Sequence, residues 1–235
     1  MLKLLKYEII ESYRQYLLTF LVFLLLCVVT PLMPITTITG ILSVLTSVCF
    51  FGIIIAMFLN VIISFNRSMY KRPGYLTLTL PVSSEKLIGA KLIGSLIWIS
   101  ASMLVLLVGI TILLFTTGEV RMANFFEALI IVVKRTFSNF DVFLIYLVDY
   151  LAFMSAIILS FYLVITFTKT KFIPKYKTFV GIAIYFISWI VIFSFLERLP
   201  IVYSNEISSI CLGVCLSLIF FVATVYLINH QIEVE

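Results

Sequence analysis

Residues 92–116 read LIGSLIWISASMLVLLVGITILLFT and contain no charged side chain. An apolar run of about 20 residues is long enough to cross the hydrocarbon core of a bilayer as an α-helix. Strands of a membrane barrel would instead alternate polar and apolar residues over about 10 positions. Because lipid offers no hydrogen-bond partner to an exposed peptide group, the run is predicted to be a transmembrane helix.

The whole sequence has the composition of a membrane protein. Of its 235 residues, 63% are hydrophobic and 11% are charged, and the mean hydropathy is +1.23. A soluble domain has about 45–50% apolar and about 25% charged residues. The net charge of +5 is spread over short loops between apolar segments, which favours a role in topology over nucleic-acid binding. We therefore expect an all-α polytopic membrane protein with no nucleic-acid partner.

Five more apolar segments lead to a prediction of six transmembrane helices in a single membrane domain, 1–235. Residues 1–15 mix charged and apolar side chains, as a helix lying in the membrane interface does. Twelve of the 16 lysines and arginines fall on one side of this arrangement, which predicts that both termini lie in the cytoplasm. The membrane is expected to be the plasma membrane. The predicted spans are 16–36, 43–65, 92–116, 143–168, 178–196 and 207–229.

Residues 119–140, between the third and fourth spans, are predicted to form an amphipathic extracellular helix. Apolar residues from Met122 to Phe137 recur with the i, i+3, i+4, i+7 spacing of one helix face, and charged residues such as Glu127 and Lys134 lie mostly opposite. Such a helix either lies flat on lipid or covers a cavity between the spans, and the pattern leaves both readings open.

Two polar residues inside the spans are candidates for a translocation path or for helix packing. Asp149 is the acidic residue placed well inside a predicted span, and Ala152, Ala156 and Ser160 follow it on one helix face. Asn60 continues a similar stripe of small residues in the second span. Small residues four apart let helix backbones approach closely, so we expect Asp149 to point into a helix–helix contact.

Motifs for catalysis or cofactor binding are absent from the sequence. It has no G-x-x-x-x-G-K-[ST] phosphate loop, no H-E-x-x-H zinc motif and no G-x-S-x-G nucleophile elbow. The four cysteines all fall inside predicted spans, where they are expected to act as small apolar packing residues. We predict no catalytic residue, no metal ligand and no cofactor on this chain.

The coupling segment, residues 66–86, reads NRSMYKRPGYLTLTLPVSSEK and is the longest predicted cytoplasmic loop. Pro73–Gly74 predicts a turn, and Ser83 or Ser84 can cap the helix that follows, with Glu85 in its first turn. The alternating leucines between them predict that this loop is docked, either on a partner protein or on the membrane and neighbouring helices.

The coupling segment resembles the cytoplasmic loop of ABC type 2 exporter permeases. Many members of that family have an Arg, a Gly-Tyr-Leu-Thr-Leu-Pro-like run, a Val-Ser pair and a nearby Lys. The corresponding residues here are Arg67, Gly74, Tyr75, Leu76, Thr77, Leu78, Thr79, Leu80, Pro81, Val82, Ser83, Lys86 and Lys91.

The resemblance implies the membrane subunit of an ATP-driven exporter. Two permease copies, identical or homologous, would form the path, and separate ABC ATPase subunits would bind ATP and Mg²⁺. The residues implied to contact the ATPase are Arg67, Tyr75, Leu76, Leu78, Leu80 and Pro81. Small permeases of this kind often export toxic or antimicrobial peptides, among them phenol-soluble modulins, so an amphipathic peptide-like cargo is expected. The alternative is an ATP-independent secondary transporter, which would depend on Asp149, or a membrane assembly factor.

Overall fold

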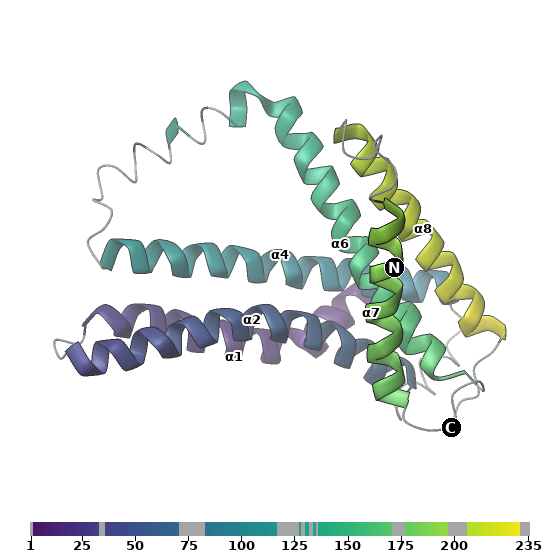
Figure 1. Ribbon diagram of the computed structural model, residues 1–235, viewed down its shortest axis with the longest axis horizontal. Helices are drawn as coiled ribbons and strands as arrows, with labels where there is room; N and C mark the ends of the chain where they lie inside the picture. The colour runs from purple at the N-terminus through teal and green to yellow at the C-terminus, as the bar shows by residue number, and fades with distance from the viewer. Residues whose placement is uncertain are drawn as a thin grey trace. The chain divides into compact units, whose positions relative to one another are not determined.

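The computed structural model describes residues 2–32, 36–70, 83–116, 127, 130–131, 134, 136–170, 177–196 and 206–230. Nearly every residue in these ranges is helical, which confirms the all-α prediction for this part of the chain. The helices are α1 (Leu2–Leu32), α2 (Thr36–Tyr70), α4 (Ser84–Thr116), α6 (Phe140–Thr168), α7 (Lys177–Leu196) and α8 (Glu206–His230) (Figure 1).

Length and composition decide which helices are able to cross a bilayer. In the described ranges, four segments are long and apolar enough: Ser43–Tyr70, Ser84–Phe115, Phe140–Thr168 and Ile207–His230. A fifth is added if the two parts of α1, Leu4–Arg14 and Tyr16–Thr30, form one span with a 43° bend. The apolar part of α7, Phe179–Ser194, is shorter. Four to five long apolar helices are the architecture of a multi-pass membrane protein.

Several helix boundaries differ from those predicted, and α2 runs from Thr36 to Tyr70 where a span was expected over 43–65. The first span was expected to continue to residue 36, but α1 ends at Leu32 and α2 begins at Thr36. Residues 33–35, which include Pro34, lie outside the described residues. The third span was expected to begin at residue 92, but α4 begins at Ser84, about two turns earlier.

Local signals explain the early start of α4. The carbonyl of Ser83 accepts hydrogen bonds from the backbone N–H groups of Lys86 at 3.0 Å and Leu87 at 3.3 Å. Glu85 lies in the first turn, where the positive end of the helix dipole favours an acidic side chain.

Most of the predicted amphipathic helix, 119–140, lies outside the described residues. Its conformation and its place on lipid or over a cavity therefore stay a prediction.

The helices pack as two compact units. One comprises Tyr7–Asn60 and Ile97–Phe140; the other comprises Met1–Lys6, Val61–Leu96 and Asp141–Glu235. The division falls within α2 and α4, which contribute residues to both units. A single membrane domain over 1–235 stays a prediction.

In the unit that contains most of α1, this helix runs antiparallel to α2 and parallel to α4. Thr30 and Thr46 share a hydrogen bond of 2.8 Å, and farther along α1 the Tyr16 hydroxyl reaches the Met57 carbonyl at 3.5 Å. Tyr16 also stacks on Trp98 of α4, with ring centroids 4.6 Å apart. The buried core of this unit is formed by Phe23, Cys27, Ile53 and Leu106.

In the other unit, the last turns of α2, α6 and α8 lie near the first turns of α4 and α7. Ser84, at the start of α4, donates a hydrogen bond of 2.7 Å to the side-chain oxygen of Asn229, at the end of α8. A Cβ atom on Gly181, in the second turn of α7, would lie 3.0 Å from the Thr168 methyl group at the end of α6.

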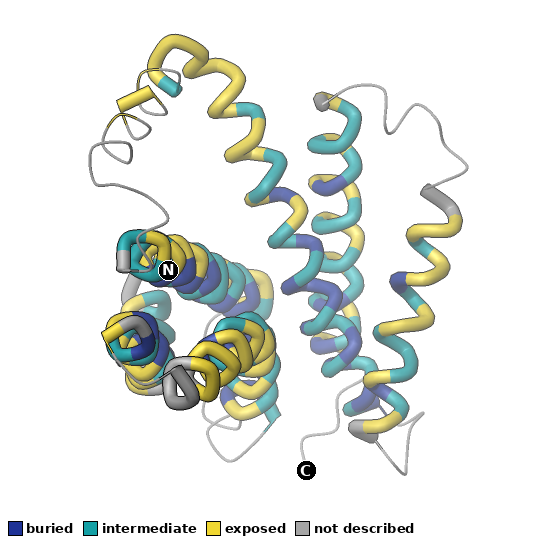
Figure 2. Tube along the Cα trace, turned by 60° about the vertical axis from the view of Figure 1, so that its left-hand side comes forward, coloured by how far each residue is buried: buried dark blue, intermediate teal, exposed yellow. Residues whose placement is uncertain are grey.

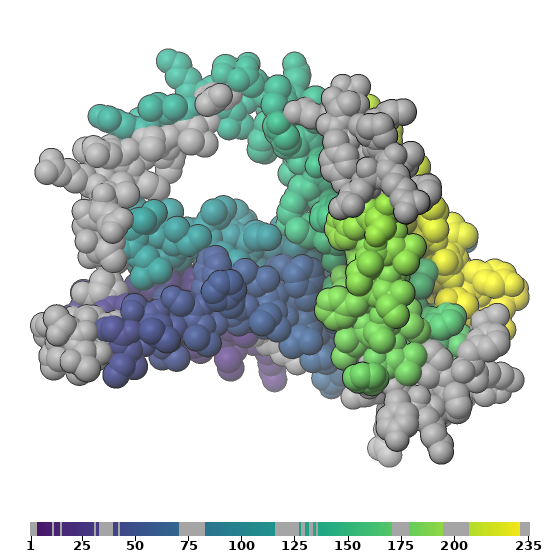
Figure 3. Space-filling view, in the orientation of Figure 1, coloured from purple at the N-terminus to yellow at the C-terminus, as the bar shows by residue number. Residues whose placement is uncertain are grey.

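Large apolar side chains cover the outward faces of both units, while the buried positions lie where helices face one another (Figure 2). On α7, for example, Phe179 is 76% exposed and Ile190 is 64% exposed, and this helix presents an open face in Figure 3. Soluble proteins rarely expose so much contiguous apolar surface to water, whereas such a surface is stable in contact with lipid.

Candidate functional site

Of the residues implied to contact an ATPase, the structure describes Arg67. It lies in the last turn of α2, is exposed, and carries a positive charge where the helix dipole is negative. The others, Tyr75, Leu76, Leu78, Leu80 and Pro81, lie outside the described residues. The helices that flank residues 71–82 are α2, which ends at Tyr70, and α4, which begins at Ser84.

Both flanking helices are bonded to α6 through a group of side chains that we name the tyrosine cluster. Its centre is Tyr162 of α6, which is 1% exposed. The Tyr162 hydroxyl shares a hydrogen bond of 2.8 Å with Ser95 and donates one of 3.3 Å to the Lys91 carbonyl, both on α4. The members of the cluster are Phe65, Tyr70, Ser95, Tyr162 and Thr166.

The same cluster bonds α2 to α6. The Tyr70 hydroxyl donates a hydrogen bond of 2.9 Å to Thr166, whose own hydroxyl donates one of 2.7 Å to the Tyr162 carbonyl. Phe65 stacks on Tyr162, with ring centroids 4.0 Å apart and an interplanar angle of 11°. Phe65 and Thr166 are both almost fully buried. A buried, mutually satisfied polar network of this kind fixes the relative positions of the groups that form it.

Sequence reasoning missed this cluster. Lys91, whose carbonyl accepts a hydrogen bond from Tyr162, lies two turns inside α4 and is 3% exposed. Tyr162 and Thr166 are four apart on α6, which places them on one helix face and was a usable signal. Their partners lie 67 and 96 positions away in the chain, and no helical spacing identifies such pairs.

Asp149 lies in the contact between α6 and α8. Its carboxylate accepts a hydrogen bond of 2.8 Å from Ser209. One turn farther along, Gly213 packs on Ala152: a Cβ atom added to Gly213 would lie 3.2 Å from the Ala152 Cβ atom. The small residues thus let α6 and α8 approach closely where the acidic side chain is bonded. Whether Asp149 serves transport or packing alone stays open.

The fourth member of the same stripe has a different neighbour. Ser160 accepts a hydrogen bond of 3.3 Å from the indole N–H of Trp189 on α7. Trp189 also lies edge-on to Phe153, one turn from Asp149. The stripe of residues that starts at Asp149 therefore contacts α8 near the beginning of α6 and contacts α7 nearer the end of α6.

Asn60 is half-buried on α2, and its role stays a prediction. Gly52, two turns earlier on the same stripe, faces open space, because a Cβ atom there would meet nothing within 4 Å. The stripe on α2 therefore differs from that on α6, which is covered by other helices of the same chain.

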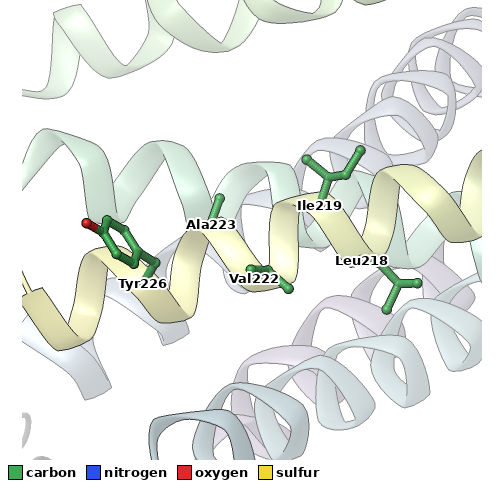
Figure 4. Close-up of a pocket in the computed structure, with 5 residues that line it drawn as sticks. All are labelled: Leu218, Ile219, Val222, Ala223 and Tyr226. Carbon is green, nitrogen blue, oxygen red and sulfur yellow. The ribbon is translucent and has the colours of Figure 1, made fainter.

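An open apolar groove lies along one face of α8, with a volume of about 490 Å³ (Figure 4). Its lining contains no charged group, and exposed Cys211 and Cys215 lie on the preceding turns of the helix. Among the side chains that the structure describes, no three His, Cys, Asp or Glu residues lie close enough to hold a metal ion. The residues that line the groove are Leu218, Ile219, Val222, Ala223 and Tyr226.

Comparison of the chain with protein-family models, curated proteins and solved structures finds no match.

Proposed function

We propose that this chain is the membrane permease subunit of an ATP-binding cassette exporter. It would cross the plasma membrane six times with both termini in the cytoplasm and pair with a second permease, identical or homologous. A separate ATPase chain would bind ATP and Mg²⁺ and drive export of an amphipathic, peptide-like cargo. The observation that carries this proposal is the residue pattern of the coupling segment, from Arg67 through the Gly74–Ser83 run to Lys86.

The direction of the helices supports six crossings. In one unit α1 runs opposite to α2 and parallel to α4, as alternating spans do. In the other unit the ends of α2, α6 and α8 lie near the beginnings of α4 and α7. Within each unit these contacts agree with an up-and-down order, in which the coupling segment and the basic loop 169–177 share one side of the membrane.

The fixation of the flanking helices supports a coupling role for residues 66–86. A loop that receives force from a partner protein is effective only if the helices at its two ends are firmly held by the rest of the membrane domain. The tyrosine cluster provides such contacts for α2 and α4 through buried hydrogen bonds and ring stacking.

The test is a pair of charge substitutions in the coupling segment. Leu78→Asp and Leu80→Asp should abolish co-purification of the ATPase while leaving membrane insertion and expression unchanged, because a carboxylate would be buried in the protein contact. Val202→Asp is the matched control, since it places the same charge in the loop predicted on the opposite side. Normal ATPase recovery with both segment variants would refute the coupling role.

A secondary transporter is the second candidate, and the observation that favours it is an acidic group bonded between two apolar helices. Asp149→Asn keeps an oxygen that accepts the Ser209 hydrogen bond but removes the titratable proton. A proton-coupled carrier would lose transport in this variant, whereas the exporter proposed here would keep it.

A further inference from the structure

The helix α6 makes specific polar contacts at two levels along its length. Near its end, Tyr162 and Thr166 are bonded to α4 and α2. Nearer its beginning, Asp149 is bonded to Ser209 of α8. Asp149 and Tyr162 are 13 positions apart, which corresponds to about 20 Å along a helix. The two levels are thus separated by most of the hydrocarbon thickness of about 30 Å.

At each level the two helices are packed closely enough that displacement of one would displace the other. Phe65 and Tyr162 stack 4.0 Å apart between α2 and α6. At the other level, Gly213 and Ala152 leave no room for a Cβ atom between α8 and α6 without displacement. A continuous helix between such contacts is rigid, and packed interfaces shift between discrete arrangements instead of deforming continuously.

We propose that α6 transmits displacement of the coupling segment to α8, with Tyr162 as the positioning residue at the α2–α4 end and the Asp149–Ser209 pair at the other. The inference rests on the proposed function, because the displacement would originate in the ATPase. Tyr162 holds this role because its hydroxyl bonds α4, its ring stacks on α2 and its backbone belongs to α6.

A direct hydrogen bond between α4 and α8 provides a control for the proposed path through α6. Ser84 and Asn229 are hydrogen-bonded, but this contact is exposed. Water replaces an exposed hydrogen bond with little loss, whereas a buried one has no such substitute. Asn229→Ala should therefore leave the transmission intact, and Tyr162→Phe should disrupt it while keeping the ring stack with Phe65.

The experiment uses the native complex with its ATPase in lipid nanodiscs and reads α8 through Cys211, an exposed cysteine two positions after Ser209. Cys27, Cys49 and Cys215 are replaced by alanine. The rate at which N-ethylmaleimide reacts with Cys211 is measured without nucleotide and with MgATP plus vanadate, and ATP hydrolysis is measured on the same samples. This readout needs no knowledge of the cargo.

Nucleotide should change the Cys211 rate by about fivefold or more in the parent protein and in Asn229→Ala, the lower bound of typical allosteric coupling. In Tyr162→Phe and Thr166→Val the change should fall below about twofold, with ATP hydrolysis retained. Thr166→Val removes the Tyr70 bond at nearly constant volume, and it tests the inference separately if Tyr162→Phe fails to fold.

Two outcomes would overturn the inference in distinguishable ways. A parent chain that carries no ATPase would remove the proposed function and this inference together. A parent complex whose Cys211 rate responds to nucleotide, with the same response in Tyr162→Phe and Thr166→Val, would leave the exporter standing and exclude α6 as the transmitting helix.

Discussion

Gly213→Val, compared with Gly52→Val, isolates the close approach of α6 and α8. Both glycines lie within long apolar helices, so the helix-propensity term of the substitution is the same for each. They differ in what the new side chain meets. At Gly213 even a Cβ atom would lie 3.2 Å from the Ala152 Cβ atom and 3.4 Å from the α6 backbone; at Gly52 it would meet nothing within 4 Å.

The structure gives the size of the effect. Carbon atoms pack best at about 3.5–4.0 Å, so accommodating a Cβ atom at Gly213 requires α6 and α8 to separate by about 0.3–0.8 Å, and valine adds two more methyl groups. That separation also stretches the Asp149–Ser209 hydrogen bond, which is 2.8 Å long. Overpacking of this kind destabilises a protein by about 1–3 kcal/mol.

The assay is unfolding of the purified chain in mixed micelles with increasing SDS, followed by circular dichroism. Gly213→Val should lower the free energy of unfolding by about 1–3 kcal/mol, and Gly52→Val should leave it unchanged or raise it slightly. Equal destabilisation by the two variants would refute the claim that the α6–α8 contact is the sterically restricted one.

Two further predictions concern single contacts. Ser209→Ala should lower the free energy of unfolding by about 0.6 kcal/mol, the average for a hydrogen bond between membrane helices. Asp149→Asn should leave the free energy of unfolding unchanged, because the acceptor oxygen remains. The same SDS titration measures both variants, and a larger loss in Asp149→Asn than in Ser209→Ala would contradict the packing argument. Gly109→Ala should destabilise the chain by about 1–3 kcal/mol, since its Cβ atom would overlap the buried Phe23 ring. Combining it with Phe23→Leu should remove part of that loss, and strict additivity in the double-mutant cycle would show that the two positions do not interact.

The helices could be predicted from the sequence because the signal is local. Residues 92–116 and the corresponding apolar runs in α2, α6 and α8 contain enough consecutive apolar side chains to cross a bilayer. The position of Asp149 in a helix contact also followed from local spacing, since the small residues after it define a face that packs closely.

Tertiary partners could not be predicted in the same way. The stripe that starts at Asp149 contacts α8 at Ala152 but α7 at Ser160, and nothing in a four-residue spacing distinguishes one neighbouring helix from another. The burial of Lys91 could not be predicted for a related reason, since it depends on the tertiary neighbours of the first turns of α4 and not on the local sequence.

The most direct test of the central claim is gentle detergent purification of the tagged full-length chain from its native host, with identification and quantification of every protein recovered. The exporter account predicts an ATPase with a phosphate-loop motif, recovered in stoichiometric amount and hydrolysing MgATP in the complex. Recovery of the chain without any ATPase, under conditions that keep other such complexes intact, would contradict the account and favour an ATP-independent carrier.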